Sequence, residues 1–299
     1  IDTARTPYFA EPQLVAAGWS EPVKLAEPLN TDCPEDAIEI SRDGTTLYFF
    51  WSPEVNASDA VLLEIETGTY HAERVGADPG LFDDPRFFDL GKGAEGGSVD
   101  GEPSFTPGGD SVYFHSTRID NTGYQQAEPV DDPMDIYLAA IYDGEPGPAV
   151  NLGEPVNSIY IDGEHCLSPD GSRLYLASRR PEGEGDVDIW VSTRTDGVWS
   201  EPVDMPAPIN SSHAELQPAF AADDPNTIYF VSDRDGPASI YRSTFDGSAW
   251  SEPEMMLTGY VGEPSLTGDG EIMYFVHVLV DDDGVFGADI WYVRRIGTE

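Results

Sequence analysis

The sequence predicts an all-β protein, a five-bladed β-propeller with four antiparallel strands in each blade. Three observations lead to this fold: five approximate repeats of a strand–turn–strand pattern, tight-turn residues inside each repeat, and an unmatched strand near the N-terminus. Repeats with a period of about 20–50 residues or slightly more indicate small units that bury their apolar faces against one another. No long segment has the apolar period of a helix that would compete with this reading.

Each repeat begins with an apolar strand, a tight turn and a tyrosine-containing strand. Asp-Gly, Gly-Gly and Asp-Pro-Asn turns join the two strands, as in β-hairpins. The copies begin near residues 36, 102, 164, 217 and 263, and we interpret residues 1–299 as one propeller domain. Five tyrosines share one position and are expected to pack between blades: Tyr48, Tyr113, Tyr175, Tyr229 and Tyr274.

The third and fourth strands complete each blade. The third strand reads AVLLEIET from residue 60 in the first copy and VDIWVSTR from residue 187 in the third. The fourth is clearest as VWSEPVDM from residue 198, with degenerate versions near Tyr70 and Pro148. The fifth copy ends at Arg295 without a fourth strand, whereas Gly18–Leu25 has no blade of its own. We therefore expect Gly18–Leu25 to complete the last blade and close the ring.

The run SPDGSRLYLASRRPEGEGDVDIWVSTRTDGVWSEPV (Ser168–Val203) resembles the WD40-like repeat of the TolB-type propellers, called PD40. The matching features are Ser-Pro-Asp-Gly, the Leu-Tyr strand with its following arginine, Asp-Ile-Trp and Trp-Ser-Glu-Pro. The resemblance extends over nearly the whole chain, and the third copy is close to the consensus. It implies a propeller and commonly a periplasmic or secreted setting, but the fold carries binding modules and enzymes alike.

Acidity is the strongest compositional feature. The chain has 56 acidic and 15 basic residues, a formal net charge of −41, and only two lysines, Lys24 and Lys92. Such a surface repels itself until salt screens it, which indicates either a saline or marine habitat or acids that collect divalent cations. Without a basic patch, nucleic acid and anionic membranes are not expected as partners.

Other features concern the compartment of the chain. No apolar run approaches the roughly 20 residues of a membrane span, so we expect no membrane-spanning segment. The chain starts at Ile1 without methionine, which agrees with a secreted or periplasmic protein whose leader was removed. Cys33 and Cys166 make no disulfide framework and are expected to be free thiols.

Candidate site residues lie at the start of the innermost strands, which line the central channel of a propeller. Equivalent positions there are expected to meet at one rim as an acidic mouth. The candidate ligand-binding residues are Glu35, Asp36, Glu102, Glu164, His165, Glu215, Gln217 and Glu263. Converging carboxylates repel one another unless a cation, a polyhydroxylated ligand or raised pKa values offset the repulsion. The alternative is that these residues recur only because the repeats share a common origin, and that their side chains are solvated or hydrogen-bonded to neighbouring blades.

Three functions stay open at this level. The absence of nucleophile and phosphate-loop motifs favours a non-catalytic module that binds a protein, a glycan or a cation at the channel face. A glycan-active enzyme of the glycoside hydrolase type would use Glu102, Glu164 and Glu263 as catalytic carboxylates. A metal-dependent lyase or lactonase would combine the mouth acids with histidines.

Two acidic loops, Glu182–Asp188 and Asp281–Asp289, are candidates for Ca²⁺, which takes several oxygen ligands. The candidate metal ligands are Asp186, Asp188, Asp281, Asp283 and Asp289. Solvated loops are the alternative. At the blade corners, ion pairs are expected between Arg118 and Asp135 and between Arg180 and Asp188.

Overall fold

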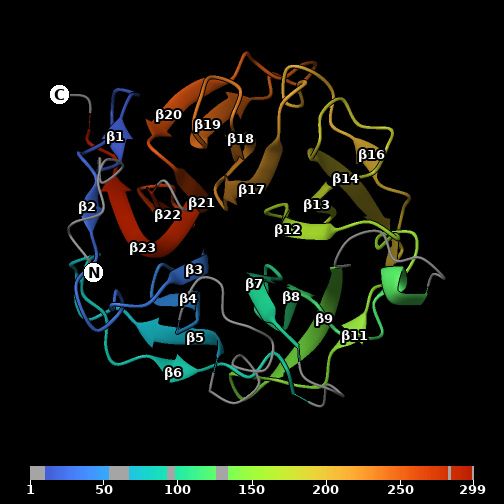
Figure 1. Cartoon of the computed structure of the whole chain (residues 1–299), viewed down its shortest axis with the longest axis horizontal. Coiled ribbons are helices and arrows are strands. Elements are labelled where there is room, and N and C mark those ends of the chain that lie inside the picture. Colours follow the sequence, from blue (N-terminus) through green and yellow to red (C-terminus); the bar gives the residue numbers. More distant parts are fainter. Residues whose placement is uncertain (1–10, 54–66, 93–97, 126–133, 282–283, 298–299) are drawn as a thin grey trace.

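The computed structural model describes residues 11–53, 67–92, 98–125, 134–281 and 284–297. They form five antiparallel sheets around a central channel (Figure 1), which confirms the predicted five-bladed propeller. In these ranges the one helix is the 3-10 turn η1 (Thr122–Gln125). Within the same ranges, no helix has the length and apolar character needed to cross a bilayer.

The first three blades follow one another along the chain. Blade 1 comprises β3 (Glu35–Ile40), β4 (Thr46–Trp51), β5 (Gly68–Glu73) and β6 (Arg86–Phe87). Blade 2 comprises β7 (Asp100–Phe105), β8 (Ser111–Ser116), β9 (Asp135–Tyr142), β10 (Glu145–Pro146) and β11 (Val150–Asn151). Blade 3 comprises β12 (Asp162–Leu167), β13 (Arg173–Ser178), β14 (Asp188–Thr195), β15 (Val198–Trp199) and β16 (Val203–Asp204).

The last two blades each take a strand from the N-terminal segment. Blade 4 comprises β17 (Glu215–Ala221), β18 (Asp224–Ser232), β19 (Ser239–Thr244), β20 (Glu254–Thr258) and β1 (Gln13–Leu14). Blade 5 comprises β21 (Val261–Leu266), β22 (Ile272–Asp281), β23 (Gly284–Arg294) and β2 (Val23–Lys24). In every blade the strand named first above lies innermost (Figure 1). The N-terminal strands β1 and β2 lie at the outer edges of blades 4 and 5.

The ring closes through the N-terminal segment, as predicted. Lys24 of β2 pairs with Trp291 of β23, and Trp19 forms an isolated bridge with Arg295. The segment does more than the sequence indicated, because β1 also adds an outer strand to blade 4 by pairing Gln13 with Thr258. The N-terminal segment therefore joins the outer edges of two neighbouring blades.

Blade 1 differs from the prediction. Tyr70 was expected in the fourth strand but lies in β5, the third strand, where it pairs with Phe87 of β6. The expected third strand from Ala60 falls on residues 54–66, outside the described ranges. The segment between β5 and β7 supplies β6, and its Phe88 and Leu90 are buried in the apolar cluster shared with blade 2.

The hydrophobic core is divided into five clusters, each between two neighbouring blades. The equivalent tyrosines belong to these clusters or pack against them, which confirms their predicted position between blades. Trp19 is buried in one cluster, and Trp199 and Trp250 pack against two others. The channel walls are therefore fixed by side chains that hold adjacent blades together.

In blades 2, 3 and 5 a repeated asparagine, which the sequence analysis did not predict, ties the connecting loop to the third strand. The side-chain oxygen of Asn157 accepts a hydrogen bond from the Ile136 amide at 2.9 Å, and its side-chain nitrogen donates to the Ile136 carbonyl at 2.9 Å. Asn30 makes the same pair of bonds with Ile290, and Asn210 with Ile189. A buried asparagine here replaces the backbone partner that a longer fourth strand would supply.

Replacing Asn157 with alanine is expected to lower the free energy of unfolding by about 1–3 kcal/mol, because the buried Ile136 amide loses its side-chain partner and the Ile136 carbonyl keeps only the bond from the Leu152 amide. Urea denaturation followed by tryptophan fluorescence measures the change. Asn226, whose side chain is exposed in the β17–β18 hairpin, is the matched control, and its alanine variant is expected to stay within about 0.5 kcal/mol of the parent. Equal losses in both variants would contradict the role given to Asn157.

Candidate functional site

Five equivalent residues on the innermost strands have left-handed backbone conformations. Their φ angles lie between 46° and 54°, and they are Ala37, Glu102, Glu164, Gln217 and Glu263. At each of them the register with the second strand shifts, as in a β-bulge. Glutamate and alanine seldom adopt positive φ, so five occurrences at one position mark a conformation that the surroundings enforce. We call these five residues the channel ring.

Side chains of the channel ring reach from one blade to the backbone of the next. Glu102 accepts a hydrogen bond from the His165 amide at 3.1 Å, Gln217 from the Glu263 amide at 2.9 Å, and Glu263 from the Ile38 amide at 3.1 Å. At Glu102, Gln217 and Glu263 the bulge turns the side chain toward the next blade, and these bonds offset the strain of the left-handed backbone. These residues therefore fasten the blades together around the channel.

The glycine before the ring residue makes room for a neighbouring side chain. Gly101, Gly163 and Gly262 lack positive φ, so no left-handed backbone conformation requires glycine there. A Cβ atom at Gly262 would lie 2.7 Å from the side-chain oxygen of Gln217, which crosses over it. At Gly163 a Cβ would lie 2.5 Å from the Met134 methyl carbon. Gly262 thus leaves room for the side chain of the preceding blade.

Burial dominates the electrostatics of the ring. It raises the pKa of Glu102 and Glu263 well above the usual range of a glutamate, and that of Glu164 to about 8. Burial also raises the pKa of Asp36, whose carboxyl is hydrogen-bonded to Glu263. Nearby like charges add to the effect for all three glutamates. The predicted convergence of carboxylates therefore applies to Asp36, Glu102, Glu164 and Glu263, which lie inside the channel.

Two histidines stand beside Glu102. Nδ1 of His115, on β8, lies 3.1 Å from Oε2 of Glu102, and Nδ1 of His165, on β12, lies 3.8 Å from the same oxygen. Burial lowers the pKa of both imidazoles, that of His165 to about 3 with a contribution from neighbouring His115. Both rings are therefore neutral at physiological pH. His165 is among the candidate residues that the sequence predicts, whereas His115 is not.

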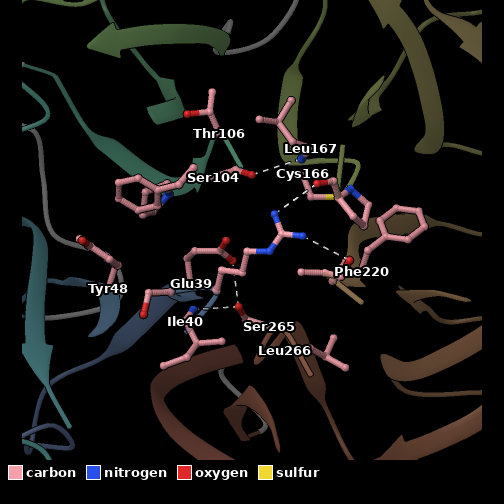
Figure 2. A pocket seen from close by; sticks show the side chains of 18 of the residues that line it. Glu39, Ile40, Tyr48, Ser104, Thr106, Cys166, Leu167, Phe220, Ser265 and Leu266 are labelled. Carbon is pink, nitrogen blue, oxygen red and sulfur yellow. Dashed lines mark hydrogen bonds between the residues drawn. The ribbon is translucent and has the colours of Figure 1, made fainter. Parts of the chain in front are cut away.

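A cavity of about 550 Å³ extends from the channel ring to the rim formed by the β-hairpins. This is the rim opposite to the one at which the sequence placed the acidic mouth. Glu102, His165, Gln217 and Glu263 line its inner part. Tyr48 and Phe220 stand on opposite sides of it (Figure 2).

Glu39 is a cavity residue that the sequence reading missed. Burial raises its pKa to about 7, and it accepts a hydrogen bond from the Ser265 hydroxyl at 2.8 Å (Figure 2). Its equivalents in the other blades also face the channel, and they are Ser104, Cys166, Ala219 and Ser265. Side chains alternate between the two faces of a strand, and this alternation could have predicted that Glu39 faces the channel.

Arg42 spans the hairpin-side opening of the cavity. Its guanidinium donates to the carbonyls of Pro169 and Ala222, both at 3.4 Å, so a residue of blade 1 reaches blades 3 and 4. The Gly268 amide donates to the Arg42 carbonyl at 2.8 Å and fixes the backbone of this turn. A cation therefore lies over the opening of an acidic cavity.

Glu35 and Glu215 do not line this cavity. Both side chains are fully buried at blade corners, where Glu35 accepts hydrogen bonds from Thr31 and Glu215 pairs with Arg234 at 3.0 Å. Equivalent corners contain the ion pairs Arg118–Asp100 and Arg180–Asp162, both at 3.1 Å.

The corner pairs proposed from the sequence are therefore wrong. Asp135 accepts hydrogen bonds from Thr122 and Asn151 instead of pairing with Arg118, and Asp188 accepts one from the Gly185 amide.

The predicted metal ligands of the acidic loops have separate surroundings, and in the described ranges no three of their side chains gather with metal-ligand spacing. Asp186 is exposed and 3.7 Å from Arg179, whereas Asp289 pairs with Lys24 at 2.7 Å. Asp188 is buried at the start of β14. Asp281 ends β22, and Asp283 falls outside the described residues. Among the described residues, the one group with metal-ligand spacing is Glu102, His115 and His165.

The two cysteines are free, as predicted. Cys166 lines the channel cavity, where burial raises the pKa of its thiol well above the usual range. A thiol in this environment stays protonated and is a weak nucleophile.

Comparisons with known proteins agree with the fold. The chain matches no protein-family model and no curated protein. Similar solved structures include a thermostable family-43 glycoside hydrolase, with 13% identity over 92% of this chain and 93% of the other and a TM-score of 0.55. An α-L-arabinofuranosidase from Lactobacillus brevis has 13% identity over 89% and 92% of the two chains and a TM-score of 0.52.

A protein assigned as TolB from Agrobacterium tumefaciens is also similar, with 18% identity over 89% of this chain and 76% of the other and a TM-score of 0.48. Similarities at such low identity show the propeller fold alone. The chemistry of the channel therefore has to be argued from its own residues.

Proposed function

We propose that this chain is a binding propeller that takes a small polyhydroxylated ligand of the glycan class in its channel cavity. The observation that carries the proposal is the lining of that cavity, where buried carboxyl groups stand beside partly exposed aromatic rings. The volume of about 550 Å³ fits the range of small-molecule sites, about 300–1,000 Å³.

The protonation of the carboxyls favours hydroxyl groups over a cationic ligand. Burial raises the pKa of Glu39 to about 7, so this carboxyl is partly protonated near neutral pH, and it raises the pKa of Glu102 and Glu263 well above the usual range. A protonated carboxyl both donates and accepts hydrogen bonds, as a sugar hydroxyl does. Tyr48 and Phe220 line the cavity and are partly exposed, so they offer aromatic surface to the apolar side of a sugar ring.

The bonding of the ring carboxyls favours binding over catalysis. Glu102 and Glu263 each accept a hydrogen bond from the backbone of the next blade. Part of their hydrogen-bonding capacity therefore holds the blades together and is not free to act on a substrate. A secreted or periplasmic setting, which would expose the protein to glycans, remains a prediction from the repeat.

The test is saturation-transfer NMR and calorimetry with galactose, arabinobiose and cellobiose. At least one of these sugars is expected to bind, and Ala222→Trp, which places an indole at the hairpin-side rim of the cavity, should weaken binding at least about 10-fold. Val203→Trp, at an exposed position on β16, is the matched control and should bind as the parent does. The proposal is overturned if none of the sugars binds, or if Ala222→Trp binds equally well.

One observation favours a second function, glycoside hydrolysis. A carboxyl with a pKa of about 7, such as Glu39, suits a general acid, and Glu102 or Glu263 would be the second carboxylate. Turnover of nitrophenyl arabinosides or galactosides that disappears in Glu39→Gln would favour this function. Absence of turnover with sugar binding intact would favour the binding propeller.

A further inference from the structure

We propose that Glu102, His115 and His165 form a binding site for one divalent transition-metal ion, best suited to Zn²⁺, at the inner end of the channel cavity. The three residues come from two neighbouring blades: Glu102 and His115 lie on β7 and β8, and His165 lies on β12. The inference goes beyond the proposed glycan ligand and does not depend on it.

The spacing of the ligand atoms carries the first step. One atom from each of the three side chains lies within 4.8 Å of the others, and the two distances to Oε2 of Glu102 are 3.1 and 3.8 Å. Zinc bonds of about 2.0–2.2 Å in a tetrahedron place adjacent ligand atoms roughly 3.3 Å apart. Small side-chain rotations therefore bring the three atoms to bonding distance from one ion.

The state of the His165 side chain is the second, independent observation. The residue is 3% exposed, yet neither ring nitrogen makes a hydrogen bond in the structure. Buried polar atoms nearly always have a partner, so an orphaned imidazole points to a missing one. Its Nδ1 faces Oε2 of Glu102 at 3.8 Å, which is too long for a hydrogen bond and suitable for two ligands of one ion.

Surrounding groups fit the requirements of a metal site. The backbone of Tyr113 lies near the His165 ring, without hydrogen-bond geometry to either ring nitrogen. Metal-bound histidines commonly direct their second N–H to a backbone carbonyl, which fixes the ring. Glu164, the neighbour of His165 in the chain, has a buried carboxyl oxygen without a hydrogen-bond partner in the structure.

The donor set decides between metals. Ca²⁺ and Mg²⁺ take oxygen ligands, whereas two imidazoles and one carboxylate suit Zn²⁺ and neighbouring transition metals. Two of the three ligands, Glu102 and His165, line the cavity, so a remaining coordination position would face it. A hydroxyl or carboxylate of a ligand in the cavity could bind there.

The test is zinc binding to the full chain after treatment with EDTA, measured by calorimetry and elemental analysis in 0.5 M NaCl. Wild-type protein is expected to bind one Zn²⁺ per chain, and His115→Gln and His165→Gln should each weaken binding by about 100-fold or more. His213→Gln is the control, because this histidine is 47% exposed beside Asp233 and outside the channel. Near-ultraviolet circular dichroism before zinc addition checks that each variant is folded.

X-ray absorption at the zinc edge keeps the proposal testable if a variant does not fold. Two imidazole nitrogens in the first shell of the wild-type protein would support the site. An oxygen-only shell, several weakly bound ions, or zinc affinity unchanged in both channel-histidine variants would show that zinc binds only to the acidic surface and would overturn the proposal.

Discussion

Replacing Arg180 with alanine is expected to destabilise the protein by about 3–5 kcal/mol near pH 8, the cost of leaving a buried charge without its partner. The Arg180 guanidinium pairs with Asp162 at 3.1 Å, donates to the Val156 carbonyl and stacks over the Trp190 ring at 5.7 Å. Both members of the pair are buried, so water cannot replace the lost contact.

The loss is expected to depend on pH. Burial raises the pKa of Asp162, and Arg180 opposes this rise, so removing the arginine raises the pKa further. A carboxyl whose folded-state pKa exceeds its unfolded value binds more protons in the folded state, and stability therefore falls as pH rises between the two values. The Arg180→Ala variant should lose less stability at pH 5 than at pH 8, which urea denaturation at both values measures.

A double-mutant cycle separates the pair from the packing of the arginine. Asp162→Asn in the Arg180→Ala background should recover part of the loss at pH 8, because the buried charge is gone. Arg173→Ala is the control, because Arg173 is exposed at the start of β13. This substitution should lower the free energy of unfolding by no more than about 0.5 kcal/mol. A cycle without coupling, or equal losses for Arg173→Ala and Arg180→Ala, would show that the corner pair does not stabilise the blade.

The corners show where sequence reasoning reached its limit. In the register of blade 2, Ser116 lies opposite Asp100 on one side and opposite Asp135 on the other. Arg118, two residues later, was therefore near two carboxylates, and the sequence offered no reason to choose the inner strand. The choice depends on the loop after β8, which provides Thr122 as a partner for Asp135.

The fold itself was predictable because its signals are local and repeated. Turn residues, strand alternation and the unmatched Gly18–Leu25 together determine the number of blades and the way the ring closes. The outer strand of the first blade was placed wrongly because β6 lies in a segment that lacks the Trp-Ser-Glu-Pro motif found near Trp19, Trp199 and Trp250. Burial of Phe88 and Leu90 compensates for this short strand, and such packing has no pattern in sequence.

The site was predicted in part. Counting along equivalent strands placed Asp36, Glu102, Glu164 and Glu263 together, but it could not show that the ring residues have positive φ, because glutamate rarely adopts it. Positive φ turns the side chains across the blade seams, and this places the cavity on the hairpin side. Glu39 escaped notice because its repeat equivalents are small residues.

Glu39→Gln is expected to stabilise the protein at pH 8 by up to about 3 kcal/mol. Burial raises the pKa of Glu39 to about 7 from an ordinary value of 4.5, and only the Ser265 hydroxyl bond is found to oppose the rise. Between these values the folded state holds the proton that the unfolded state releases, so stability falls as pH rises, by about 1.4 kcal/mol for each unit. Glutamine can still accept the Ser265 bond and carries no charge at any pH.

Urea denaturation at pH 4.5, 6 and 8.5 in 1 M NaCl measures this effect with the surface charges screened. Wild-type stability should decrease across the series, and Glu39→Gln should flatten the decrease without removing it, because burial also raises the pKa of Glu35 to about 7. Glu201→Gln, at an exposed position, should keep the wild-type slope. Parallel slopes for Glu39→Gln and Glu201→Gln would mean that Glu39 is ionised at little cost in the channel. The cavity would then suit a cation better than a neutral sugar.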